Sequence, residues 1–248
     1  RTPVLVMADA EVGHMTEKVV ISDPSDVEIT NRAHVRRGDV EPDRFRIYRN
    51  GPSSGNSEPK KTAYISPMTA AGEGYRIHVT GLTHDERGYP VMTAKAHEWN
   101  VTRLVEKIRS HLDDIIYLEE QNLEDAEVVV VSYGISARTS LWPVAQARSE
   151  GIKVGFLRLV TVWPFPEERI RQIARSIRAF VVPEINMGQI IREVERSAAG
   201  QAQVLGANRP GGDILEPQLV LARIRQAAGR PPGHEEKVVQ AVSEPSEE

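Results

Sequence analysis

Short apolar runs alternate with amphipathic segments over residues 125–228. The runs are rich in β-branched residues, as buried strands are, and each is followed by a segment with apolar residues at helical spacing. This alternation predicts an α/β fold, a parallel sheet of at least four strands with helices on both faces. The expected strands are 127–132, 153–159, 179–183 and 203–206, and the expected helices end near residues 150, 177, 198 and 227.

A long amphipathic helix is expected upstream of this region. Apolar residues from Val101 to Ile116 recur at intervals of three and four, and Asn100 is a suitable N-cap. Such a stripe is expected to pack against another element. The polar stretch Glu119–Asp125 then indicates a break before the first strand, and Pro143 requires the next helix either to begin late or to kink.

The chain opens on a short apolar run, Val4–Ala8, which ends at Asp9. Such a run is typical of a buried strand, and a buried strand needs neighbours on both edges, so we expect the chain to begin inside a fold. The alternative is an edge strand, for which Pro3 is a suitable first residue. The expected organisation is the end of one domain over 1–20, a loop-rich insert and connecting helix over 21–124, the α/β domain over 125–228, and a disordered acidic tail over 229–248.

Composition narrows the classes of function. The 248 residues include 31 basic and 35 acidic side chains, for a net charge of −4, and aromatic residues make up 5%. Neither nucleic acid nor a membrane surface is therefore an expected partner. The absence of cysteine excludes a cysteine nucleophile and thiolate ligation of zinc or iron–sulfur clusters by these residues. No apolar run approaches the roughly 20 residues that span a bilayer, and a cytoplasmic location is expected.

The insert is locally basic between Asn31 and Lys61, where Gly51–Ser57 has the composition of a loop. A segment of this kind can hold a phosphate group or an acidic partner, and the alternative is an ordinary solvated surface. The glycine motifs of phosphate loops and of dinucleotide-binding folds are both absent from the chain.

Two candidate sites lie at strand ends of the α/β region. Gly134, Ser136 and Arg138 follow the first strand, where a helix N-terminus and a guanidinium are available to a phosphate or carboxylate. A plain glycine turn with a surface arginine is the alternative interpretation of this pattern. Glu184 and Asn186 follow the third strand, at the edge where ligands of open α/β sheets gather.

The stretch Thr80–Pro90 is unusually polar. It places His84, Arg87 and two carboxylates between Gly81 and Gly88, with few apolar side chains. The flanking glycines allow the backbone to come close to a ligand or another chain. We therefore expect an exposed loop that faces a ligand or a subunit interface.

Five stretches are distinctive in combination: Arg1–Val4, Asp9–Met15, Thr80–Pro90, Trp163–Pro166 and Val182–Gln189. Together they resemble the alpha subunits of 2-oxoacid:ferredoxin oxidoreductases, and most of all those of 2-oxoglutarate:ferredoxin oxidoreductases (2-oxoglutarate synthases). The resemblance covers most of residues 1–228, and Thr80–Pro90 is its most specific part. It implies that 1–20 is the end of a thiamine-pyrimidine-binding domain and that 125–228 is a transketolase C-terminal-like domain.

The resemblance implies oxidative decarboxylation of a 2-oxoacid on thiamine diphosphate, with transfer of the acyl group to coenzyme A and of electrons to ferredoxin. Thiamine diphosphate, Mg²⁺ and iron–sulfur clusters would be held mainly by a beta subunit or by the rest of the pyrimidine-binding domain. The family's glutamate that activates the thiamine ring has no counterpart in this sequence. The isolated chain is therefore expected to be inactive.

The resemblance also implies roles for the candidate residues. Thr83, His84 and Arg87 would meet a substrate carboxylate, while Gly134, Ser136 and Arg138, with Glu184 and Asn186, would lie on the coenzyme or cofactor side. Two other hypotheses stay open: a non-catalytic scaffold subunit, and the beta subunit of a thiamine-dependent 2-oxoacid dehydrogenase or a transketolase-like enzyme.

Overall fold

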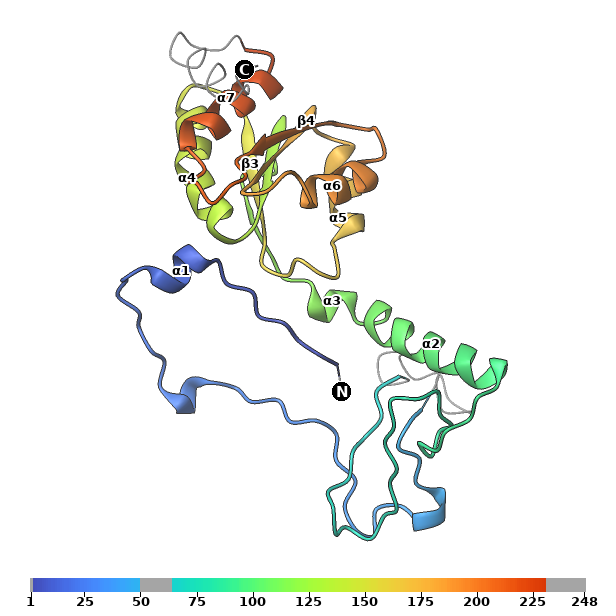
Figure 1. Cartoon of the computed structure of the whole chain (residues 1–248). Coiled ribbons are helices and arrows are strands. Elements are labelled where there is room, and N and C mark those ends of the chain that lie inside the picture. Colours follow the sequence, from blue (N-terminus) through green and yellow to red (C-terminus); the bar gives the residue numbers. More distant parts are fainter. Residues whose placement is uncertain (1, 50–63, 231–248) are drawn as a thin grey trace. The chain divides into compact units, whose positions relative to one another are not determined.

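The computed structural model describes residues 2–49 and 64–230 (Figure 1). It divides into two compact units, one formed by the residues up to Glu17 together with those from Ile115 onward, and the other by Lys18–Asp114. The predicted loop Gly51–Ser57 and nearly all of the predicted acidic tail lie outside the described residues.

The first unit is built on a five-stranded sheet of order β1-β3-β2-β4-β5. Strands β3, β2, β4 and β5 are parallel to their neighbours, and β1 pairs with β3 in the antiparallel direction. The predicted parallel sheet is thus confirmed. The strands are β1 Leu118–Gln121, β2 Val128–Ser132, β3 Val154–Leu159, β4 Ala179–Glu184 and β5 Gln203–Asn208.

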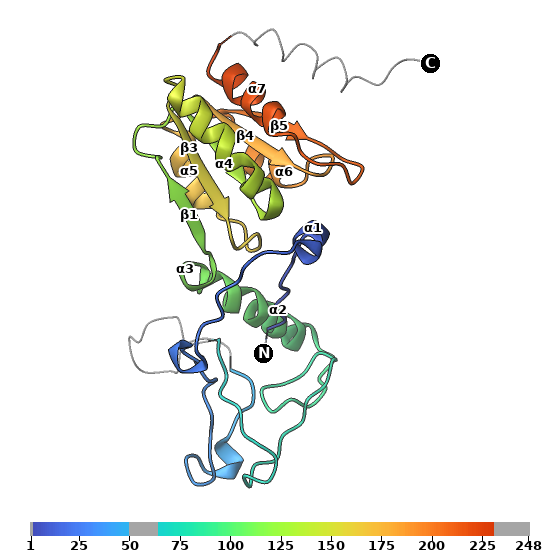
Figure 2. The same ribbon diagram turned by 90° about the vertical axis from the view of Figure 1, so that its left-hand side faces the viewer.

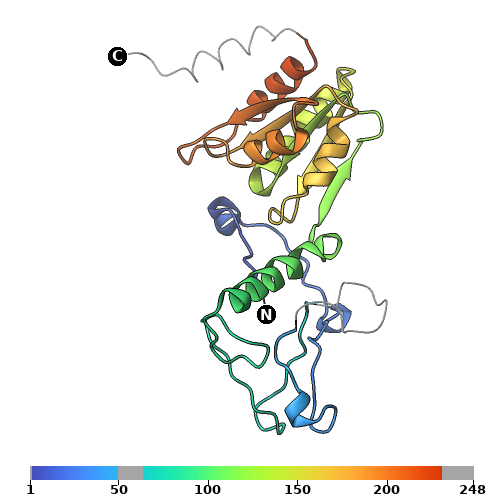
Figure 3. The same ribbon diagram turned by 90° about the vertical axis from the view of Figure 1, so that its right-hand side faces the viewer.

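Helices cover both faces of the sheet. Successive side chains of β2 point to opposite faces: Val128 and Val130 pack with α4 and α7, whereas Val129 and Val131 pack with α5 and α6. Figures 2 and 3 show the two helix layers from opposite sides. All four valines are fully buried, which explains why this strand is a continuous β-branched run rather than an alternating one. The helices are α4 Gly134–Ser149, α5 Glu167–Ala174, α6 Ile190–Ala198 and α7 Pro217–Ala227.

Two elements of this unit differ from expectation. The stretch predicted as a polar break contains the edge strand β1, whose acidic side chains pair with arginines of other elements: Glu119 with Arg158 and Glu120 with Arg169. An edge strand needs apolar side chains on one face only, so its sequence contains no continuous apolar run. Helix α4 begins at Gly134 and continues through Pro143 rather than beginning late.

The predicted buried strand at Val4–Ala8 is wrong. Val4–Met7 is an exposed segment outside any strand, and the short helix α1, Ala10–His14, follows it. No described strand pairs with this segment, so its backbone has no sheet to join.

The second unit contains few regular elements and a small core. Val35, Phe45, Ile47 and Tyr48 are buried there, with Trp99 packed against them. Its helices are the 3-10 turns η1 Pro24–Asp26 and η2 Pro42–Arg44 and the α-helix α2 Ala94–Arg109; α3, Leu112–Ile115, lies at the boundary between the units.

Helix α2 buries a different face from the one that its apolar stripe predicts. Its N-cap is Thr93, whose side chain accepts a hydrogen bond from the N–H of Ala96, and Asn100 lies within the helix. The buried side chains are Asn100 and Arg103, whereas Leu104 of the apolar stripe is half exposed. The polar face turns inward because the neighbouring loop offers it hydrogen-bond and aromatic partners.

Candidate functional site

Two predicted residues, Glu184 and Asn186, lie with Tyr133 at the carboxyl ends of β2 and β4. The two strands are parallel neighbours, so the residues that follow them lie at the same edge of the sheet. Tyr133 follows β2, and Glu184 is the last residue of β4. The Tyr133 hydroxyl donates to Glu184 Oε1 at 3.1 Å, and Asn186 Nδ2 donates to the same oxygen at 3.2 Å.

Glu184 is fully buried and caps helix α6. Its carboxylate accepts backbone N–H groups from Gln189 at 3.1 Å, Ile190 at 2.9 Å and Ile191 at 3.1 Å. These are donors that the first turn of a helix leaves without intrahelical partners. A negative charge at this end is also favoured by the helix dipole. Both carboxylate oxygens are therefore engaged within the fold.

Burial raises the pKa of Tyr133 to about 12, and the negative charge of Glu184 adds to the effect. The phenol is thus held in its protonated, donating form. Asn186 continues the network: it donates to the Tyr133 oxygen at 3.1 Å and accepts the N–H of Gly188 at 2.7 Å. Tyr133 was missed by the sequence reasoning, because a lone tyrosine after a strand gives no signal of its partner 51 residues away.

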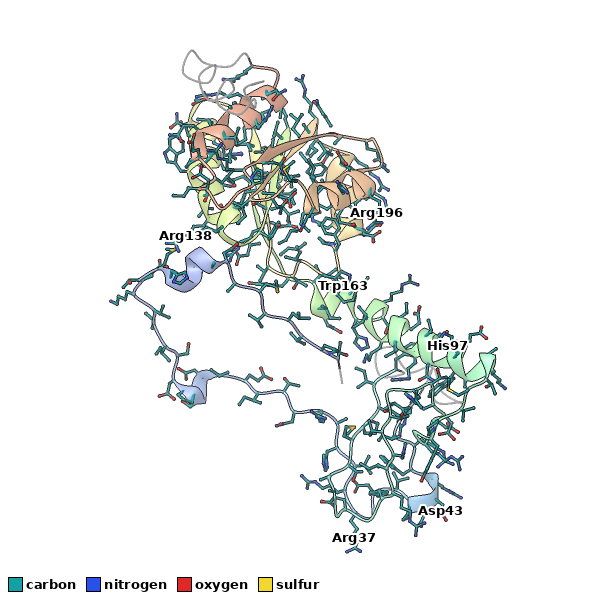
Figure 4. The ribbon with its side chains drawn as sticks, in the orientation of Figure 1. Arg37, Asp43, His97, Arg138, Trp163 and Arg196 are labelled. Atoms are coloured by element: carbon teal, nitrogen blue, oxygen red, sulfur yellow. The ribbon has the colours of Figure 1, made fainter. Side chains whose placement is uncertain are left out.

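At the anion position predicted after β2, the structure has two carboxylates of the same chain. The N–H of Ile135 donates to Asp9 Oδ2 at 2.8 Å, and Arg138 makes two parallel bonds of 2.9 Å to the Glu17 carboxylate. Figure 4 shows Arg138 beside the segment that carries α1. Gly134 has a φ of +53°, and a Cβ there would lie 2.5 Å from Asp9 Oδ2. The left-handed backbone therefore favours glycine here, and a larger residue would also displace the Asp9 carboxylate.

The charges at this position reinforce one another. The hydrogen bonds that Arg138 donates to Glu17 lower the pKa of Glu17 and raise the pKa of Arg138. Both side chains are about half exposed, so the pair contributes little to stability. Ser136, the third predicted residue, is buried within α4. Asp9 and Glu17 lie more than a hundred residues from their partners, and nothing in the local sequence announces them.

The expectation that His84 lies in an exposed loop is wrong. Its side chain is buried, with the ring 4.2 Å from that of Tyr48 and edge-on to Trp99. Its Nδ1 lies 2.8 Å from the carbonyl of Leu82, and Arg103 Nη2 lies 3.5 Å from its Nε2. The partners that bury it come from distant positions, so the polar composition of the loop did not reveal them.

Helix α2 completes this cluster. Asn100 Nδ2 donates to the His84 carbonyl at 2.7 Å. The Arg103 guanidinium lies 4.6 Å from the centre of the Tyr48 ring and 5.6 Å from that of Trp99, within range of cation–π attraction. These contacts explain why the polar face of α2 points inward.

Arg87 is directed into its own loop. Its guanidinium donates to Asp85 Oδ2 at 3.0 and 2.9 Å, while Asp85 Oδ1 accepts the N–H groups of Arg87 and Tyr89. Burial opposes the charged form of Asp85, but these bonds outweigh it and lower its pKa. Thr83 Oγ1 lies 3.4 Å from His97 Nδ1 (Figure 4 labels His97). Thr83, His84 and Arg87 therefore have separate partners.

Gly88 fixes the shape of this turn. Its φ is +91°, and a Cβ would lie 1.9 Å from the carbonyl oxygen of His78. The His78 ring in turn has Nδ1 2.8 Å from the Gly88 oxygen and stacks on Tyr89 at 5.0 Å. The close backbone approach expected of these glycines is thus found at Gly88, toward the chain's own backbone.

Comparison with known proteins identifies the class of the α/β unit. Residues 126–220 match the family model for the pyruvate:ferredoxin oxidoreductase core domain II. The structure of a 2-oxoglutarate:ferredoxin oxidoreductase from Magnetococcus marinus, solved with 2-oxoglutarate, coenzyme A and succinyl-CoA bound, has a TM-score of 0.66 at 23% identity. The match covers 84% of this chain and 34% of that one and shows a shared fold. The unit is a core domain of the pyruvate:ferredoxin oxidoreductase type.

Sequence relatives extend the similarity to most of the chain. The 2-oxoglutarate synthase subunit KorA of Methanocaldococcus jannaschii is 41% identical over 223 residues, which are 88% of this chain and 54% of that protein. The subunit of the same name from Methanothermobacter marburgensis is 41% identical over 229 residues, 90% and 56%. The ketoisovalerate oxidoreductase subunit VorB of the latter organism is 43% identical over 126 residues, 51% and 36%.

These matches confirm the predicted resemblance of the chain to the alpha subunits of 2-oxoacid:ferredoxin oxidoreductases. The chain spans about half the length of the curated relatives it matches. Among the described residues, no helix is both long enough and apolar enough to cross a bilayer.

Proposed function

We propose that this chain is part of the alpha-type subunit of a 2-oxoglutarate:ferredoxin oxidoreductase. The reaction converts 2-oxoglutarate, coenzyme A and two oxidised ferredoxins into succinyl-CoA, carbon dioxide, a proton and two reduced ferredoxins. The observation that carries the proposal is the 41% identity to a KorA subunit over 88% of the chain, because a match of that extent includes both compact units. The partners are then a beta subunit, ferredoxin, coenzyme A and the 2-oxoacid, and the expected location is the cytoplasm.

The choice of 2-oxoacid rests on the extent of the matches. The VorB relative acts, by its name, on ketoisovalerate, and its match covers about half of this chain. The KorA matches cover nearly all of it, so 2-oxoglutarate is favoured.

The redox and thiamine cofactors do not fit the residues present. The 248 residues contain no cysteine for an iron–sulfur cluster. Within the described part of the chain, no three acidic or histidine side chains are grouped to hold Mg²⁺. Glu184 is fully buried and already bonded through both oxygens. We assign thiamine diphosphate, Mg²⁺ and the clusters to partner subunits or to other parts of the protein, and no step is assigned to this chain through them.

The contribution of this chain would be in positioning and contact. Arg87 is the most accessible of the proposed substrate contacts, and it would exchange Asp85 for a substrate carboxylate. Gly134, Ser136 and Arg138 would meet a coenzyme A phosphate only after Asp9 and Glu17 leave. Glu184 and Asn186 would shape that edge of the sheet from within.

A scaffold role is the second candidate, and the burial of His84 favours it. The ring is enclosed by Tyr48, Trp99 and Arg103, as a structural side chain would be. If this role is correct, His84→Ala lowers the melting temperature of the complex and leaves kcat/KM unchanged.

The test is an assay of the complex, with the complete subunit co-expressed with its partner subunits. Reduction of methyl viologen is followed with 2-oxoglutarate, 2-oxoisovalerate or pyruvate, each with and without coenzyme A. We expect coenzyme A-dependent reduction with 2-oxoglutarate preferred at least about tenfold in kcat/KM, a difference of about 1.4 kcal/mol in transition-state binding. A preference for 2-oxoisovalerate would assign the subunit to the other branch. No reduction with any 2-oxoacid would overturn the proposal.

The residue-level proposal is tested in the same assay. Losing one charge-assisted hydrogen bond costs about 1.5–3 kcal/mol, so Arg87→Ala should lower kcat/KM by roughly tenfold to a hundredfold. Arg171→Ala is the control, because Arg171 is a partly exposed arginine that is also paired with a nearby carboxylate, that of Glu168. Equal effects of the two substitutions would remove Arg87 from the site.

A further inference from the structure

An open pocket of about 630 Å³ lies in the second unit and shares no lining residue with the clusters around Glu184, Arg138 and His84. Its volume is within the range of small-molecule sites. The residues that line it are Asn31, Arg32, His34, Arg36, Met68 and Thr69. They include two arginines and a histidine and no acidic residue.

The backbone explains why the basic side chains gather on one side. His34 forms an isolated parallel bridge with Met68, and the N–H of Val35 donates to the Met68 carbonyl at 2.7 Å. Val35 points into the small core and is buried. Side chains alternate along an extended segment, so Arg32, His34 and Arg36 share the side opposite to Val35.

The two guanidinium groups are available to a ligand. Within the described part of the chain, neither Arg32 nor Arg36 has an ion pair, unlike Arg138. Asp39, the acidic residue nearest to Arg36 in sequence, uses its carboxylate to accept the backbone N–H of Arg36 at 2.8 Å. Cations that are left unneutralised around a concave surface attract an anion.

Thr69 adds an independent observation. The residue is 6% exposed, and its Oγ1 is buried with no hydrogen-bond partner among residues 2–49 and 64–230. A buried hydroxyl without a partner is uncommon and costs about 1–3 kcal/mol. The hydroxyl of a threonine in the lining of a basic pocket can donate to an anion's oxygen, and the Asn31 amide offers a second neutral donor.

We propose that Asn31, Arg32, His34, Arg36 and Thr69 form a binding site for a small ligand that carries two or more phosphate groups. Alternate residues of an extended segment are about 6.6 Å apart, so the three basic side chains start from a span of about 13 Å. That span exceeds a single phosphate and suits linked or neighbouring ones. Arginine is the side chain best matched to phosphate, through paired N–H donors. The site is independent of the proposed oxidoreductase activity.

The experiment is titration calorimetry of the 248-residue chain with inorganic pyrophosphate at low salt. The chain should bind the probe, and replacing both Arg32 and Arg36 with Ala should weaken binding at least tenfold. Replacing Arg44 and Arg76 with Ala removes the same charge from exposed positions of the same unit outside the pocket lining, and should change affinity less than twofold. Thr69→Val keeps the shape and removes the hydroxyl, and should weaken binding severalfold. Circular dichroism verifies that each variant is folded.

Two results would overturn the site: no pyrophosphate binding by the folded chain, or equal losses in the two double variants, which would mean a general effect of charge. Competition then distinguishes the sources of the phosphate groups. Displacement of pyrophosphate by coenzyme A would assign the site to that coenzyme, and retention would assign it to a different phosphorylated molecule; either result supports the site. Because the readout is binding, a failure of the oxidoreductase proposal would leave it unaffected.

Discussion

Removing the Glu184 carboxylate should destabilise the α/β unit strongly. Glu184→Ala deprives three backbone N–H groups, the Tyr133 hydroxyl and the Asn186 amide of an acceptor in a fully buried position. Loss of a helix cap alone costs about 0.5–2 kcal/mol. Each buried donor left unpaired adds about 1–3 kcal/mol. Since some donors will find other acceptors, we expect a loss of about 3–5 kcal/mol in the free energy of unfolding, a large share of the roughly 5–15 kcal/mol typical of a domain.

Two variants sharpen this test. Glu184→Gln keeps the shape but turns one acceptor into a donor that faces backbone N–H groups, so it should cost about 1.5–3 kcal/mol. Glu195→Ala, on the exposed side of the same helix, should stay within about 0.5 kcal/mol. Urea unfolding gives the free energies, and hydrogen exchange should show faster exchange of the α6 amides. If Glu184→Ala is as stable as Glu195→Ala, the carboxylate does not hold the helix, and a contact with cofactor becomes the better explanation of this residue.

The remaining predictions concern the turn at Gly88 and the phenol of Tyr133. Gly88→Ala should destabilise the second unit by more than about 2 kcal/mol, because its Cβ would meet the His78 carbonyl at 1.9 Å, whereas Gly81→Ala, with nothing within 4 Å, should have little effect on thermal melting. Similar melting temperatures for the two variants would refute the conclusion that the turn requires glycine at position 88. The folded-state pKa of Tyr133, about 12, exceeds its ordinary value of 10.0, so its contribution to stability is present below about pH 10 and is lost as pH rises toward about 12. The difference in unfolding free energy between the wild type and Tyr133→Phe should therefore shrink over that range, and a constant difference would contradict the shift.

The α/β unit was largely predictable because its periodicity reflects burial. Val128–Val131 must be apolar on both faces, since helices cover the sheet on each side, and no polar pattern competes with that requirement. The edge strand β1 was missed for the same reason. Its Glu119 and Glu120 face arginines rather than the core, so its sequence resembles a loop.

The second unit was poorly predictable because its interior is partly polar. Helix α2 turns Asn100 and Arg103 inward, where they contact a carbonyl and two aromatic rings. Three residues of its apolar stripe, Val101, Leu104 and Val105, are exposed. Amphipathicity identified the helix but gave the wrong buried face. His84 was misplaced in the same way: its polar neighbours in sequence suggested exposure, while its neighbours in space, Tyr48 and Trp99, bury it.

The carboxyl edge of the sheet shows a common arrangement at two helices. Open α/β folds generally bind ligands there, because helix N-termini present free N–H groups to anions. In this chain Asp9 meets the start of α4, and Glu184 meets the start of α6. The two differ in permanence. Glu184 belongs to β4 and is fully buried. Asp9 lies on a segment that also contacts the α/β unit through the ion pair between Glu17 and Arg138, and that ion pair is exposed. Loss of the carboxylate at α6 would unpair buried donors, so we expect any anionic ligand at this edge to compete with Asp9 and Glu17 rather than with Glu184.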